Sequence, residues 1–190
     1  MAVFKKRLVL IFITIVLLLV TQNGRADQRR PYAMPNHGTL ILTVPSSWKQ
    51  EVSSLNDQFP TISFFPSQGD DFRVLIAPLW SPTKDPSFNQ PARIKNLIET
   101  DLTSMQSQAL EKKVAIQTIK GTDGEGYYFL LTDKNPKPGE YPYLMRAGMG
   151  VGDLLISVTV LSRSKGAEVF KATIKLLREA RQEKDEISSE

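Results

Sequence analysis

The sequence contains no cysteine and only one histidine, His37. The absence of cysteine excludes disulfides, thiolate metal sites, cysteine nucleophiles and lipid attachment through an N-terminal cysteine. A serine triad or a histidine metal cluster would have to use His37, which has no partner at a recognisable spacing. We interpret it as a solvated loop histidine, and we expect no catalytic residue, no metal site and no cofactor.

An excess of charge is also lacking once the N-terminal segment is set aside. The whole chain has 24 basic and 20 acidic residues and a net charge of +4. The first 26 residues contain no acidic residue, and their basic residues are Lys5, Lys6, Arg7 and Arg25. The rest of the chain is therefore neutral overall. Because phosphate binding needs clustered cations, we expect no nucleic-acid partner.

Residues 1–26 have the order of a secretory signal peptide. Three basic residues precede an apolar run from Leu8 to Val20, and small residues follow at Gly24 and Ala26. This order predicts cleavage between Ala26 and Asp27. A retained anchor is the alternative, but a spanning helix needs about 20 apolar residues. We expect export to the periplasm of a Gram-negative bacterium, with the thylakoid lumen or secretion as alternatives, and membrane contact only through an uncleaved signal segment.

The mature chain alternates runs of strands with single helices. Residues 27–37 contain two prolines and predict an irregular lead-in. β-Branched and apolar runs predict strands over 38–44, 61–65, 72–79, 114–120, 126–132, 143–151 and 154–162. Helical spacing of apolar residues predicts helices over 91–109 and 166–181. Residues 182–190 are mostly charged, and we expect them to form a disordered tail.

This order of elements predicts one α+β domain over residues 38–181. Consecutive strands without a helix between them are hard to arrange in parallel, because a parallel crossover needs about a dozen residues or more. The turn residues Gly152-Asp153 between two apolar runs strongly favour a hairpin. We therefore expect one antiparallel sheet sandwiched between helices in α/β/α layers.

Two groups of residues are candidates for a partner surface. Lys171, Lys175 and Arg178 lie on one side of the last helix, where they would contact an acidic partner or anionic lipid, although such stripes are usually only solvated. Trp48 and Trp80 follow strand ends at Val-Pro-Ser-Ser-Trp and Ala-Pro-Leu-Trp. Aromatic residues in such places usually seal a core edge, and the alternative is that they line a partner groove.

Several segments together resemble the PsbP-type domain. They are Leu42 to Trp48, Val74 to Pro78, the aromatic strand Gly126 to Phe129, and the hairpin from Tyr143 to Ser162 that runs into the last helix. This domain is shared by an extrinsic photosystem II subunit, a Ran-binding nuclear import factor and bacterial envelope proteins. The resemblance implies an antiparallel sheet between helices and a non-enzymatic binding module. The export signal favours the bacterial envelope branch.

Two functions fit these observations. The first is a cofactor-free, non-enzymatic binding or assembly-helper domain whose partner is another protein of the envelope or of a thylakoid lumen complex. The alternative is a small-ligand carrier with a pocket between sheet and helix. An apolar cavity of about 300 Å³ or more with converging polar groups would favour the carrier.

Overall fold

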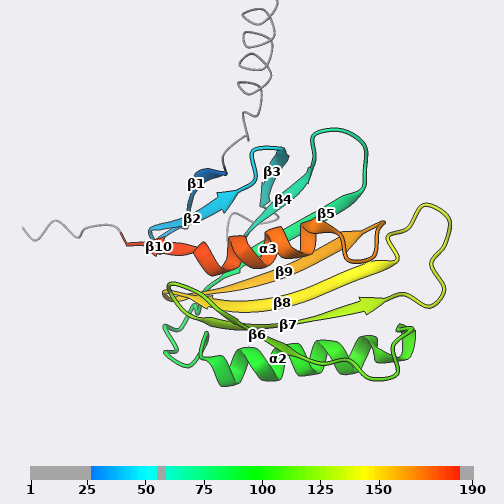
Figure 1. Cartoon of the computed structure of the whole chain (residues 1–190). Helices are drawn as coiled ribbons and strands as arrows, with labels where there is room; N and C mark the ends of the chain where they lie inside the picture. The colour runs from blue at the N-terminus through cyan, green and yellow to red at the C-terminus, as the bar shows by residue number, and fades with distance from the viewer. Residues whose placement is uncertain (1–26, 55–58, 185–190) are drawn as a thin grey trace, which may run out of the picture.

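The computed structural model describes residues 27–54 and 59–184 (Figure 1). The predicted signal segment 1–26 and residues 185–190 of the predicted tail lie outside the described residues. In the described part of the chain, no helix is both long and apolar enough to span a membrane.

The larger of two sheets has seven strands in the order β3-β4-β5-β9-β8-β7-β6, and every neighbouring pair is antiparallel. Its strands are β3 (Trp48–Ser54), β4 (Pro60–Pro66), β5 (Phe72–Leu79), β6 (Gln117–Lys120), β7 (Glu125–Thr132), β8 (Tyr143–Val151) and β9 (Leu154–Ser162). The hairpin predicted at Gly152-Asp153 is confirmed, since Val151 pairs with Leu154 across it.

A smaller sheet corrects the prediction of a single sheet. It has the order β1-β2-β10, formed by β1 (Gln28–Ala33), β2 (Thr39–Val44) and β10 (Arg181–Glu183). The expectation of an irregular lead-in over 27–37 is therefore wrong for 28–33. Pro31 is tolerated there because β1 is an edge strand that pairs only with β2. The disordered tail predicted over 182–190 is likewise wrong for Gln182 and Glu183, which pair with β2.

Two helices accompany the sheets. Helix α2 (Pro91–Met105) begins with a proline in its first turn, where the missing N–H costs no hydrogen bond, and continues into the short 3₁₀ helix η1 (Gln106–Gln108). Helix α3 (Glu168–Glu179) buries Val169, Phe170, Leu176 and Leu177. Both lie where the apolar spacing predicts helices, within a few residues at each end.

The apolar side chains form two cores. The larger core contains the inner side chains of β2, β4, β5, β8 and β9 together with the buried side of α3. The smaller core contains Ile94 and Ile98 of α2 with Phe129, Leu131 and Leu155 of the large sheet. Since neighbouring residues of a strand point to opposite faces, these two cores lie on opposite faces of the large sheet.

Helix α2 covers only part of its face of the large sheet. It contacts β7 and β8, which lie beside it in Figure 1. Leu75 of β5 lies in the same cross-strand row as Phe129, through Thr159 and Arg146, yet Leu75 is 36% exposed. The opposite face is shared by α3 and the small sheet. The class is thus α+β, with antiparallel sheets that carry more of the chain than the helices.

Candidate binding groove

A groove opens at the C-terminal end of α2, between η1, the ends of β7 to β9 and the loop that joins β7 to β8. Its volume is about 490 Å³. The apolar part of the lining is formed by Met105, Ala109, Leu131, Pro142, Leu144 and Leu161. We call this site the α2 groove. In Figure 1 the C-terminal end of α2 is at the right, near the loop between β7 and β8.

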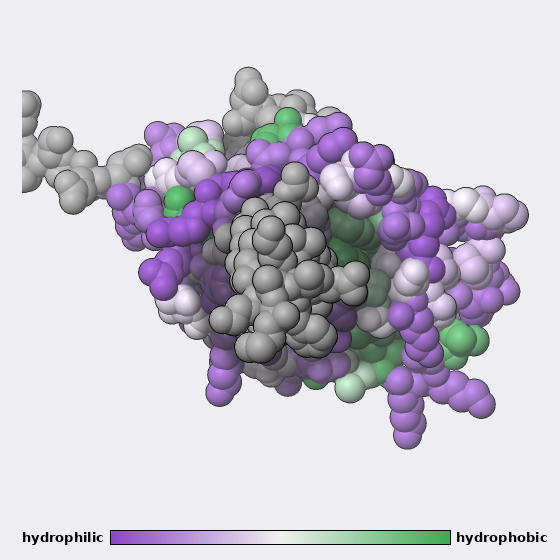
Figure 2. Space-filling view, turned by 45° about the horizontal axis from the view of Figure 1, so that its top comes forward, coloured by the Kyte–Doolittle hydropathy of each residue, from purple (hydrophilic) through white to green (hydrophobic). Residues whose placement is uncertain are grey.

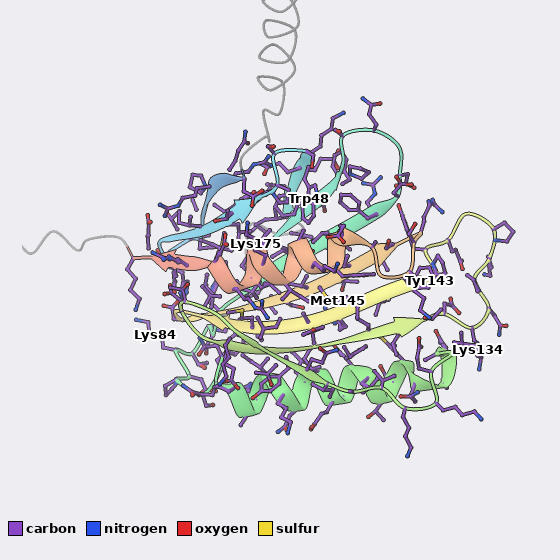
Figure 3. The ribbon with its side chains drawn as sticks, viewed as in Figure 1. Trp48, Lys84, Lys134, Tyr143, Met145 and Lys175 are labelled. Atoms are coloured by element: carbon purple, nitrogen blue, oxygen red, sulfur yellow. The ribbon has the colours of Figure 1, made fainter. Side chains whose placement is uncertain are left out.

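Backbone hydrogen bonds join the segment after α2 to the β7–β8 loop. Leu110 donates its N–H to the Thr132 carbonyl over 2.8 Å, and Lys134 donates its N–H to the Gln108 carbonyl over 3.0 Å. The Lys134 ammonium also donates to the Ser107 carbonyl, which places this side chain at the end of α2 (Figure 3). These bonds hold the helix end and the loop at a fixed separation.

The carboxylate of Glu111 stabilises the wall of the groove that is formed by the end of β7. Glu111 accepts hydrogen bonds from the Thr132 hydroxyl at 2.6 Å and from the Thr132 N–H at 2.9 Å. Burial raises the pKa of the Glu111 carboxyl, but these hydrogen bonds outweigh it and leave the pKa below its usual value. Glu111 is therefore ionised at neutral pH and uses its charge to fix Thr132.

The other wall of the groove is held by Arg163 of the loop after β9. Its guanidinium donates to the Gly139 carbonyl over 3.0 Å and lies 4.6 Å from the centre of the Tyr141 ring. It also pairs with Asp70 over 2.9 Å. The Tyr141 hydroxyl donates to the same carboxylate. This Arg163–Asp70–Tyr141 cluster orders a loop that the sequence predicts only as an exposed, proline-rich connection.

The polar residues of the groove differ in how many of their hydrogen-bonding atoms remain available to a ligand. The Thr132 and Tyr141 hydroxyls already donate to Glu111 and Asp70. Asp133 accepts the Asn135 N–H and Glu140 accepts the Lys137 N–H, each with one carboxylate oxygen. Both carboxylates therefore keep acceptor capacity at the rim.

The cationic residues predicted as a partner surface are exposed on α3. Lys171 pairs with Glu168 over 2.9 Å, and Lys175 pairs with Asp27 over 2.7 Å. Hydrogen bonding to Asp27 raises the pKa of the Lys175 ammonium above its usual value. Arg178 is exposed, and its backbone carbonyl accepts the Thr122 N–H. The stripe contributes no residue to the lining of the α2 groove.

Both tryptophans are buried. Trp48 is 7% exposed, with its ring 5.2 Å from that of Phe72 and 5.9 Å from that of Phe64. It lies at the start of β3 (Figure 3) and borders a second cavity of about 470 Å³ between that strand and α3. Trp80 is 8% exposed and lies between the rings of Phe59 and His37. Their positions fit sealed core edges.

The face of the molecule drawn in Figure 2 is mainly hydrophilic. Figure 2 shows hydrophobic side chains gathered mainly in a hollow with a hydrophilic rim. The cavity beside Trp48 includes Phe72 and Val169, and Ser47, Asp71 and Glu168 supply its polar part. This cavity has no side chain in common with the α2 groove.

His37 lies in the connection between β1 and β2, as predicted, but its side chain is largely shielded from solvent. Its ring lies 5.0 Å from that of Trp80, its Nδ1 lies 3.3 Å from Asp153 Oδ1, and 19% of its side chain is exposed. Gln182 donates to the His37 carbonyl and to Asp153, so the C-terminal strand closes over both. In the described residues no hydroxyl is hydrogen-bonded to the imidazole, and no three metal-ligating side chains lie together. His37, Asp153 and Gln182 thus form a hydrogen-bonded contact between the small sheet and the large sheet.

These features define an α+β protein with a preformed apolar groove. No family model matches the chain, and no curated protein is similar to it in sequence. A crystal structure of a protein from Bacteroides thetaiotaomicron is similar in fold, with a TM-score of 0.52 and 12% sequence identity. The match covers 85% of this chain and 50% of the other, so the chain spans half the length of that protein.

Proposed function

We propose that this protein is an exported, non-enzymatic binding domain that holds an apolar segment of another envelope protein in the α2 groove. The observation that carries the proposal is the apolar groove of about 490 Å³, whose two walls are fixed by hydrogen bonds before any ligand arrives. A site ordered in advance loses less conformational entropy on binding. Apolar anchors that fill such pockets supply most of the binding energy at protein interfaces.

We further propose that the layering is that of the PsbP-like domain, with the large sheet between helices. The two cores on opposite faces of that sheet support this arrangement, because each contains one of the two helices. The export signal and the resemblance to envelope members of that family support an extracytoplasmic partner. The periplasm of a Gram-negative bacterium is the proposed compartment.

Site-specific photo-crosslinking in intact cells tests the proposed function. A photoreactive residue at Gln108, which is exposed and lines the groove, should give a discrete adduct with one exported protein. The same residue at Thr100, which is exposed on α2 away from the lining, is the matched control. The Gln108 adduct should disappear when Ala109→Trp fills the groove. Equal adducts from both positions, or none from Gln108, would contradict the proposal.

A small-ligand carrier is the second candidate, because the groove volume lies in the range of about 300–1,000 Å³ that small-molecule sites occupy. The two functions differ in what accompanies the protein from its natural host. A carrier would retain a compound of defined mass in native mass spectrometry, lost in the Ala109→Trp variant. The binding domain would instead have an empty groove and the crosslink described above.

A further inference from the structure

The charged residues in the lining of the α2 groove have one sign. They are Asp133 and Glu140, and the lining contains no lysine or arginine. In each case one carboxylate oxygen accepts a backbone N–H of its own loop, and in the described residues neither carboxylate forms an ion pair. The groove thus combines an apolar floor with two rim carboxylates.

Two cations beside the groove, Lys134 and Arg163, are engaged elsewhere, and Lys137 of the same loop is not part of the lining. The Lys134 ammonium donates to the Ser107 carbonyl on the helix end. Arg163 is paired with Asp70 and lies over the Tyr141 ring, and its remaining bonds go to the Gly139 and Glu140 carbonyls. Neither side chain lines the groove. A cation from a ligand would therefore meet carboxylates without displacing a cation of the protein from the lining.

This charge pattern discriminates between occupants. A fatty acid or another anionic amphiphile would bring its negative group to a rim that carries negative charge, and close like charges are unfavourable. A group with an apolar body and an adjacent cation suits both parts of the site. In a protein segment, that chemistry is an apolar side chain next to lysine or arginine.

We propose that the α2 groove recognises an apolar side chain flanked by a basic residue in an exposed segment of its protein partner. This inference rests on the proposed function and adds the chemistry of the occupant. The apolar side chain fills the space beside Leu131, Leu144 and Leu161, and the basic residue lies at the rim beside Asp133 and Glu140. The apolar contact supplies affinity, and the carboxylates select the sequence.

Selection from a random heptapeptide display library tests this, with the protein purified from cells that express the full chain. Peptides that bind the native protein but not Ala109→Trp are sequenced. We expect enrichment of an apolar residue with lysine or arginine next to it. On the Asp133→Asn/Glu140→Gln variant the apolar enrichment should persist and the basic enrichment should disappear. Both substitutions retain the oxygen that accepts the loop N–H, so the loop should keep its shape.

The binding constants of a selected peptide measure how much the basic residue contributes to affinity. Replacing its lysine by glutamine should weaken binding about three- to tenfold at low salt, the effect expected for one cation beside two exposed carboxylates. Raising the ionic strength should shrink that difference. Glu99→Gln on the exposed side of α2 is the control for general loss of negative charge. Leu161→Thr provides a second groove variant should Ala109→Trp fail to fold.

Each outcome bears on one of the two proposals. Apolar enrichment without a basic neighbour would overturn the charge selection and leave the proposed function standing. Enrichment of acidic neighbours would overturn it as well. If no peptide is enriched while decyltrimethylammonium binds and decyl sulfate does not, the charge selection belongs to a small cationic ligand, and the protein-binding function fails. If neither peptides nor either amphiphile bind, both proposals fail.

Discussion

Asp70 and Arg163 form an ion pair of 2.9 Å that joins the turn between β4 and β5 to the end of β9. The Tyr141 hydroxyl donates to the same carboxylate. That hydrogen bond, followed by the hydrogen bond from Arg163, lowers the pKa of the Asp70 carboxyl below its usual value. The groove wall therefore depends on a carboxylate that must stay ionised.

Acid should weaken this wall, because a lowered pKa in the folded state means that folding favours the ionised form. The contribution of Asp70 to stability is complete above its unfolded pKa, about 3.9, and is lost as the pH falls through the lower folded value. We expect Asp70→Asn to lower the melting temperature at pH 7 and to have a smaller effect near pH 2. Thermal unfolding of both proteins across this range is the measurement. A difference that stays constant with pH would show that the charge of Asp70 is irrelevant.

A second pair fastens α2 to the sheet beneath it. Arg146 Nε lies 2.6 Å from Asp101 Oδ2, and the same guanidinium donates to the Thr159 hydroxyl over 3.1 Å. The two side chains are 20% and 22% exposed. They are thus largely removed from water, and either charge left alone would be poorly compensated.

Substitutions at this pair should be strongly non-additive. We expect Asp101→Asn and Arg146→Met each to cost about 1–3 kcal/mol of unfolding free energy, since each leaves a partner without its counter-ion. The double variant should cost clearly less than the sum, with a coupling of about 0.5–3 kcal/mol. Urea unfolding of the four proteins provides the cycle. Additive effects would mean that the two residues act independently.

The sequence predicts those elements whose signals are local. The Gly152-Asp153 turn and the apolar runs beside it define β8 and β9 without tertiary information. β3 escapes prediction because Trp48–Ser54 is mostly polar and exposed, and its strand form depends on pairing with β4 along its whole length. β10 is short and charged, and it exists because Gln182 and its neighbours pair with β2.

The candidate groove could be predicted only in part. Met105 and Ala109 belong to the apolar spacing that predicts α2, and Leu131, Leu144 and Leu161 belong to predicted strands. Periodicity identifies such residues as buried, but it cannot tell a filled core from an open groove. That distinction depends on where α2 ends and on the loop wall held by Arg163, neither of which has a local signal. The burial of His37 against Trp80 is likewise a contact between distant segments.

Cleavage of the signal segment gives a prediction that is independent of the fold. The enzyme that removes such segments accepts small residues before the cut, so protein from the periplasmic fraction should begin at Asp27. Ala26→Leu should leave a full-length, membrane-associated product, whereas Ala33→Leu, beyond the cut, should be processed normally. Intact-mass analysis of each fraction decides. A native protein that retains its first 26 residues would identify a permanent anchor instead.

The C-terminal strand β10 packs against the turn between β1 and β2, and the absence of a side chain at Gly38 allows this close contact. Gly38 has a φ of +69°, and a Cβ there would overlap the Glu183 carbonyl of β10. Gly166 has a similar φ of +64°, but a Cβ there would meet nothing within 4 Å. The two positions therefore have the same backbone requirement and differ only in their surroundings.

Alanine at these two glycines should separate strain from steric overlap. Gly166→Ala should cost about 1–2 kcal/mol, the cost of a left-handed conformation for a residue with a Cβ. Gly38→Ala should cost more, because the Glu183 backbone must also move away and β10 must loosen from β2. Amide hydrogen exchange should then accelerate at Gln182 of β10, whose N–H donates to the Asp123 carboxylate over 3.0 Å and whose side chain donates to the His37 carbonyl and to Asp153. If the two variants lost the same unfolding free energy and exchange at Gln182 were unchanged, β10 would be free to move away and would not constrain the turn.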